Sequence, residues 1–159
     1  MFRRDVLRTG GALGLLCGVP AAWAHHGWSS FDQDRPIYLA GRAAEVKWRN
    51  PHVELVLELQ APLALPADLG QRSVPAQVAQ VDGRALLAKT VLPTRRDRRW
   101  EIELAPLSRV GQWQVPEIQP GTELALVGFT FIGEKGDAVL RAEYLFLGGK
   151  TYGMRSGPA

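Results

Sequence analysis

The sequence predicts a mainly β protein, folded as a small antiparallel barrel of the OB type with five or six strands and one short helix. Three observations support this fold class. Apolar and polar residues alternate along several short stretches, which is typical of strands with one buried face. The first of these stretches carries an irregularity of the kind that bends a strand around a barrel. A single short helical stretch precedes the last two strands, and no strand–helix–strand spacing indicates a parallel sheet.

The first two strands form a predicted hairpin. From Ile37 to Trp48 apolar positions alternate, except that the alternation slips between Gly41 and Ala43. A β-bulge or a sharp bend explains such a slip. Asn50-Pro51 then turns the chain, and residues 52–59 alternate cleanly. One face of this second strand is apolar and consists of Val53, Leu55, Leu57 and Leu59.

Residues 60–96 are predicted to be an insertion with partial structure of its own, because prolines interrupt it repeatedly. Within it, Val74 to Val81 is a candidate edge strand. Arg84 to Leu92 is a candidate for one or two helical turns or for another strand. A structureless loop of this length is unusual in a compact domain.

The second half of the chain supplies the remaining elements. Residues 100–104 alternate as a third strand, and Pro106 to Val110 suggests a short helical turn that Gly111 ends. Residues 124–132 are apolar on both faces, which indicates a central strand. Residues 138–147 form the last strand, and residues 148–159 are expected to be a flexible tail rich in glycine. An immunoglobulin-like β-sandwich is the alternative, although it usually needs more strands.

Residues 1–24 are predicted to be a cleaved export signal. Arg3-Arg4 opens the segment, an apolar run follows, and Ala22-Trp23-Ala24 fits a signal peptidase site. The pair of arginines leaves both the general secretory and the twin-arginine routes open. The mature domain would then span residues 25–147 in the periplasm or outside the cell. The one cysteine, Cys17, lies inside the signal, so the mature chain would have no disulfide and no thiolate metal site.

The net charge argues against nucleic-acid binding. The formal charge is +3, but the predicted signal carries three arginines and one aspartate, so the mature chain carries about +1. Nucleic-acid affinity depends largely on phosphate neutralisation. No later segment has the length and apolarity of a membrane span, so we expect no membrane association after signal cleavage.

His25-His26 is followed by Phe31-Asp32, by Gly41 and by the run Trp48-Arg49-Asn50-Pro51-His52. In these residues the chain resembles an uncharacterised family of small exported bacterial proteins, a domain of unknown function. The chain departs from the family pattern in its longer residues 60–96 and in Gly41-Arg42-Ala43, where Gly-Thr-Val is usual. The resemblance implies no activity.

The three histidines of the chain, His25, His26 and His52, are the candidate metal ligands. If cleavage follows Ala24, the α-amine and the imidazole of His25 can chelate one ion, and His26 or His52 supplies a third nitrogen. Nitrogen ligands in this layout favour Cu(II), although imidazole also binds zinc. Asp32 or Glu54 could orient a ligand through a hydrogen bond. A mobile terminus is the alternative explanation of the His-His pair.

The sequence therefore favours a periplasmic, non-enzymatic OB-type binding module with a candidate copper site. The second hypothesis is a protein-interaction domain whose histidines bind no metal. The third is a copper-dependent oxidase or monooxygenase, which has the least support because a metal site alone does not imply turnover. Neither a Gly-x-Ser-x-Gly motif nor a phosphate loop is present, and no catalytic residue is assigned. The partner, a periplasmic protein or a small ligand, cannot be read from the sequence.

Overall fold

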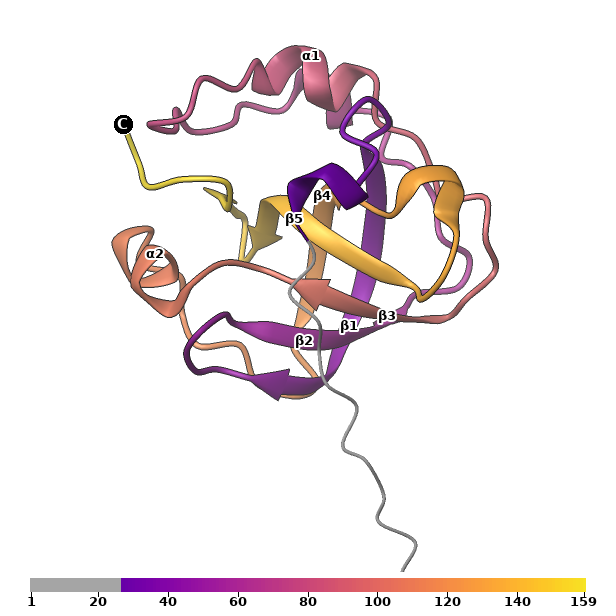
Figure 1. The fold of residues 1–159 in the computed structure, drawn as a ribbon, viewed down its shortest axis with the longest axis horizontal. Helices are drawn as coiled ribbons and strands as arrows, with labels where there is room; N and C mark the ends of the chain where they lie inside the picture. Colours follow the sequence, from indigo (N-terminus) through magenta and orange to yellow (C-terminus); the bar gives the residue numbers. More distant parts are fainter. Residues whose placement is uncertain (1–26) are drawn as a thin grey trace, which may run out of the picture.

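The computed structural model describes residues 27–159, and five strands close a barrel (Figure 1). The strands are β1 (Ile37–Lys47), β2 (Glu54–Leu59), β3 (Arg99–Glu103), β4 (Glu123–Phe129) and β5 (Val139–Leu147). Their order is β3-β2-β1-β4-β5, and a pairing between β3 and β5 closes the sheet on itself. The predicted barrel is confirmed, and closure excludes the sandwich. One detail differs, because the closing β3–β5 pair is parallel while the other neighbours are antiparallel.

β1 is long enough to pair with two neighbouring strands over different parts of its length. Its first half, Ile37 to Arg42, pairs with β4, and its second half, Gly41 to Lys47, pairs with β2. The register with β2 shifts between Ala43 and Glu45, next to the irregularity expected from the sequence. This bulge bends β1, so that the sheet curves into a barrel.

Two apolar clusters lie on opposite sides of the sheet. The first fills the barrel and includes the fully buried Trp100 together with inward-facing side chains of all five barrel strands. The second lies outside the barrel, between the outer face of the sheet and residues 60–96. Its buried members are Phe31, Tyr38, Ala40, Leu69, Leu86, Leu87, Val127, Phe129, Val139 and Tyr144. The insertion is therefore packed on the barrel as a cover.

The insertion contains the 3-10 turn η2 (Leu69–Gln71) and the helix α1 (Gly83–Ala88). Asp82 caps α1, because its Oδ1 accepts a hydrogen bond from the Ala85 amide at 3.0 Å. The prediction of an edge strand at residues 74–81 is wrong. In this stretch only Gln77 forms an isolated bridge, with Pro158. The expected short helix is α2 (Leu107–Gln112), which lies at the predicted position between β3 and β4. The helix α1 is therefore additional to it.

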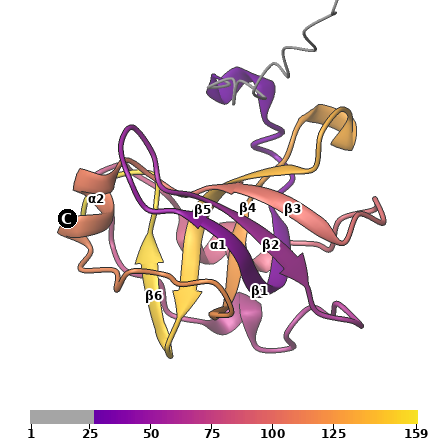
Figure 2. The same ribbon diagram turned by 90° about the horizontal axis from the view of Figure 1, so that it is seen from below.

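The expectation of a flexible tail at residues 148–159 is wrong. Gly148 and Gly149 form a tight turn, and β6 (Lys150–Gly153) pairs antiparallel with β5. Tyr152 and Met154 are buried in the barrel cluster. Apolar burial and the hydrogen bonds of β6 therefore fix this segment, and the C-terminus ends near α2 (Figure 2).

Two short 3-10 turns complete the described chain, η1 (Trp28–Ser30) before β1 and η3 (Ile132–Glu134) between β4 and β5. Within residues 27–159 no helix is long and apolar enough to cross a membrane.

Candidate functional site

His52 lies in the connection between β1 and β2, immediately before the paired part of β2. Its neighbour Val53 is buried, donates to the carbonyl of Ala105 at 2.9 Å and accepts from the amide of Leu104 at 3.0 Å. His52 itself is half-buried. The end of β3 therefore fixes the backbone at His52.

His25 and His26 lie outside the described residues, so the histidine site predicted from the sequence is only partly visible. Among residues 27–159, no three side chains of the His, Cys, Asp and Glu types are grouped so that they could hold a metal ion. A metal centre built on the three histidines thus stays a prediction.

The segment that follows the two histidines is anchored through aromatic side chains. Trp28 packs edge-on against Phe129 of β4, with ring centroids 6.2 Å apart. Phe31 is buried and stacks on Phe131 at 4.9 Å. The amide of Asp32 donates to the carbonyl of Thr130 at 2.9 Å. Residues 27–32 are therefore held against the end of β4 and the loop that follows it.

Two arginines also contact Trp28. The guanidinium carbon of Arg155 lies 4.3 Å from the indole centroid, and that of Arg141 lies 5.0 Å from it. Cations over an aromatic face are attracted by its quadrupole. A carboxylate holds each arginine. Nε of Arg141 donates to Glu103 at 2.8 Å, and Nε of Arg155 donates to Glu143 at 2.7 Å.

Strand register relates this anchor to His52. Glu54, two residues after His52, pairs with Glu103 of β3, and Glu103 pairs with Arg141 of β5. Arg141 contacts Trp28. The start of β2 is therefore two strand spacings, about 10 Å across the sheet, from β5, whose Arg141 contacts Trp28.

The two residues proposed to orient a ligand already have other partners. Oδ1 of Asp32 accepts from the Asp34 amide at 3.3 Å, and the Asp32 carbonyl accepts from the Arg35 amide at 3.3 Å, so Asp32 shapes a turn. Glu54 is buried and lies 3.6 Å from Nζ of Lys47.

Several carboxylates lie near Glu101 on β3. Burial raises the pKa of Glu101, and the carboxylates of Asp137, Glu54 and Glu103 add to this effect, while Lys47 opposes it. Glu54 and Glu103 are paired with Lys47 and Arg141.

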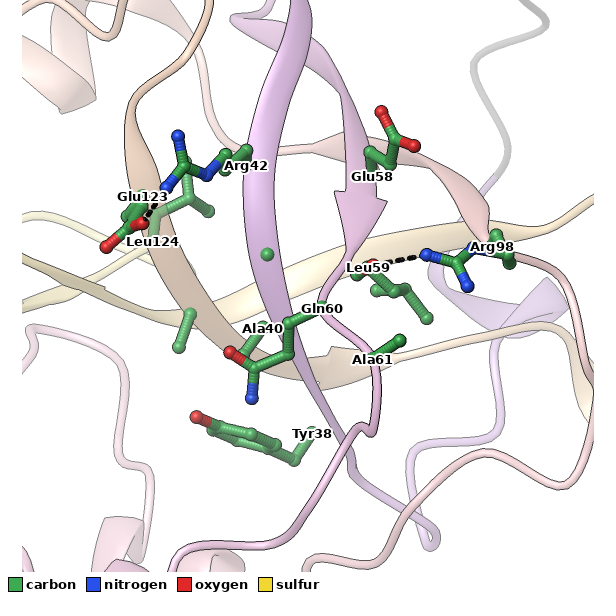
Figure 3. Close-up of a pocket in the computed structure, with 12 residues that line it drawn as sticks. Tyr38, Ala40, Arg42, Glu58, Leu59, Gln60, Ala61, Arg98, Glu123 and Leu124 are labelled. Carbon is green, nitrogen blue, oxygen red and sulfur yellow. Dashed lines mark hydrogen bonds and ion pairs between the residues drawn. The ribbon is translucent and has the colours of Figure 1, made fainter.

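A groove lies on another part of the barrel, along β1 between the end of β2 and the start of β4 (Figure 3). Its volume is about 660 Å³. The ion pair between Arg42 and Glu123 borders it on one side, and Nη2 of Arg98 donates to the carbonyl of Leu59 at 3.5 Å on the other. Neither His52 nor Trp28 lines it. Sequence reasoning did not anticipate this groove, because it forms only where the end of β2 and the start of β4 lie on opposite edges of β1.

A known protein family matches part of this region. Residues 12–66 match the model of a family of unknown function, DUF6152. The resemblance inferred from the residues is confirmed over that segment, which contains all three histidines, Trp28, β1 and β2. The match brings no activity with it. No curated protein and no solved structure shows significant similarity to the chain.

Proposed function

We propose that this protein is an exported, non-enzymatic binding module that holds a transition-metal ion through His25, His26 and His52. Copper is the favoured metal, because nitrogen ligands in a tetragonal set suit Cu(II), which also stands at the top of the divalent affinity order. The proposal includes cleavage after Ala24 and delivery to the periplasm.

The anchoring of Trp28 is the observation that carries the proposal. A free N-terminus pays conformational entropy when it binds a metal, whereas residues 27–32 are already ordered by Phe129, Phe131 and the Thr130 carbonyl. His26 is two residues from Trp28, and two extended residues span up to about 7 Å. With the length of two imidazole side chains added, that reach extends toward the start of β2, which is two strand spacings from the Arg141 that contacts Trp28.

Acid should weaken this site. Imidazole and α-amine nitrogens bind metal only when they are deprotonated, and their ordinary pKa values are about 6.5 and about 8. The affinity for Cu(II) is therefore expected to fall steadily from pH 8 to pH 5.

The test is a Cu(II) titration of protein that begins at His25. Calorimetry and electron paramagnetic resonance measure the binding. The variant His52→Ala is expected to bind at least about tenfold more weakly, because one nitrogen ligand is lost. Acetylation of the His25 α-amine should reduce the affinity more, since the acetylated nitrogen no longer binds metal. Arg49→Ala is the matched control, because Arg49 is exposed and lies in the same loop.

Three results would contradict the proposal in different ways. Equal affinity of wild type and His52→Ala removes His52 from the site. Failure of the authentic protein to bind Cu(II) rejects the metal site and leaves a protein-interaction domain. Oxygen consumption by the copper-loaded protein with a reductant would show turnover, and so reject the non-enzymatic assignment.

A further inference from the structure

The C-terminal strap, residues 154–159, joins parts of the molecule that are distant in sequence. The Met154 amide donates to the Glu143 carbonyl of β5 at 2.9 Å. The indole Nε1 of Trp113, at the end of α2, donates to the carbonyl of Ser156 at 2.8 Å. Oγ of Ser156 accepts from the amide of Ala79, in the insertion, at 2.8 Å. The strap is thus fixed at several points along its length.

Arg155 extends from this strap to the N-terminal segment. Its guanidinium lies over the indole of Trp28, and Nη1 donates to Oε1 of Gln33 at 3.3 Å. Gln33 in turn donates to the Trp28 carbonyl at 3.4 Å. Arg155 therefore contacts the ring of Trp28 directly and reaches its backbone through one side chain.

A buried carboxylate determines where Arg155 lies. Glu143 has 0% of its surface exposed, and an ionised carboxylate is costly to bury without partners. Its two oxygens are occupied from opposite sides, by Nε of Arg155 at 2.7 Å and by Nε2 of Gln77 at 3.0 Å. Since Glu143 requires a cation here, Arg155 is not free to leave Trp28 for solvent.

We propose that Arg155 is a positioning residue, which holds Trp28 on the barrel through its stacked guanidinium and so sets where the N-terminal histidines lie. The chain of contacts runs from Gln77 through Glu143 and Arg155 to Trp28. This inference rests on the proposed metal function for its consequence, but the positioning itself can be measured without metal.

The first test measures backbone order at residues 27–32 by ¹⁵N NMR relaxation on metal-free protein. The double variant Glu143→Gln/Arg155→Gln removes both charges together, so that no buried charge is left unpaired. We expect order at these residues to fall while the barrel strands remain ordered. Arg155→Lys is the second variant, because lysine keeps the ion pair with Glu143 but lacks the planar guanidinium. It should keep the thermal midpoint close to that of the wild type and still lose order at Trp28.

Arg72→Gln is the matched control. Arg72 also pairs with a carboxylate, Asp68, and its guanidinium lies 5.3 Å from the ring of Phe146. These contacts belong to the insertion and β5, so removing them should leave the order of residues 27–32 unchanged.

The second test titrates Cu(II) into the same proteins. The double variant should bind about tenfold more weakly or worse, as is usual when a group that orients metal ligands is removed, and its paramagnetic resonance spectrum should show more than one copper species. Wild-type order at Trp28 in the double variant or in Arg155→Lys would overturn the positioning role. If the variants lose order at Trp28 but the wild type binds no copper, the positioning role is supported and the proposed metal function is rejected.

Discussion

Glu134 joins three separate segments through one carboxylate. Only 6% of its side chain is exposed, and it forms an ion pair with Arg35. It also accepts from the amides of Thr94 and Arg95, each at 2.9 Å. Burial alone would raise the pKa of Glu134, but these hydrogen bonds outweigh burial and hold the pKa below its ordinary value.

This lowered pKa predicts how Glu134→Gln changes acid stability. A carboxyl whose pKa is lower in the folded state stabilises the protein above its unfolded pKa, about 4.3, and that contribution is lost as the pH falls through the folded value. The variant should be less stable by about 2 kcal/mol at pH 7, since hydrogen bonds to a charged group are lost. The gap between the two proteins should close as the pH falls from about 5 to 3. Urea unfolding at several pH values measures it, and a gap that is constant with pH would contradict the prediction.

Glu117→Gln is the control for this series, because Glu117 is exposed. Its urea midpoint should follow that of the wild type at each pH. Any general effect of removing one negative charge would appear in this variant as well.

The candidate site shows which single residues a sequence can reveal. The histidines stood out because the chain has only three of them. Glu143 and Arg155 did not, because their importance comes from a buried ion pair between residues that have no local pattern in common. Arg155 also lay in the segment expected to be flexible. The pair became visible only when the position of β6 was known.

Among the elements, β1 depends most on one residue, Gly41. A Cβ placed there would lie 2.0 Å from the carbonyl oxygen of Glu58 on β2, and backbone cannot move away as a flexible side chain can. Gly41→Ala should therefore cost about 3 kcal/mol or more, at the upper end of overpacking effects. Gly111 in α2 is the matched control, because a Cβ there meets nothing within 4 Å.

Gly111→Ala should leave stability unchanged or raise it by about 0.5–1 kcal/mol, since alanine favours a helix over glycine. Urea unfolding of the two variants measures the contrast. If both variants had the stability of the wild type, the close approach of β2 to β1 at Gly41 would be wrong.

The β5 strand shows why alternation alone can fail. Strict alternation along residues 138–147 would place Leu140, Ala142, Tyr144 and Phe146 on one face. In the structure the register with β4 shifts, so that Val127 pairs with Tyr144 while Gly128 pairs with Ala142. Glu143 is the extra residue, and Tyr144 therefore packs in the outer cluster while Ala142 packs in the barrel. A bulge moves later side chains to the other face, and no local residue pattern marked its place here.

Across the whole molecule, local patterns predicted the barrel strands and the helix α2, whereas distant contacts decided the rest. Val53, Leu55 and Leu57 alternate in the sequence and are buried in the barrel. The parallel pairing of β3 with β5 joins segments that are far apart in sequence, and alternation carries no information about it. The insertion was also uncertain, because Leu86 and Leu87 form a core only against the outside of the barrel.

The C-terminal segment contains a pair of glycines that is compatible with either a hairpin turn or a flexible tail. Gly148 and Gly149 have φ angles of 58° and 76°, and a pair of glycines with positive φ is favoured in a two-residue β-hairpin turn. Glycine-rich segments at chain ends are also often poorly ordered. Burial of Tyr152 and Met154 decides between the two structures, and burial is a property of the whole fold.

Removal of residues 150–159 is therefore expected to abolish cooperative folding. Tyr152 and Met154, which are 7% and 1% exposed, both pack in the barrel cluster. Loss of a large buried side chain costs about 2–5 kcal/mol, and two such losses approach the whole stability of a small domain, about 5–15 kcal/mol. The deletion also leaves Glu143 without Arg155. Circular dichroism during thermal unfolding measures the effect, with a deletion of only the exposed Pro158 and Ala159 as control. If the protein without residues 150–159 unfolded sharply within a few degrees of the wild type, β6 and the strap would contribute little to the fold. Arg155 could then not be held firmly beside Trp28 by the strap.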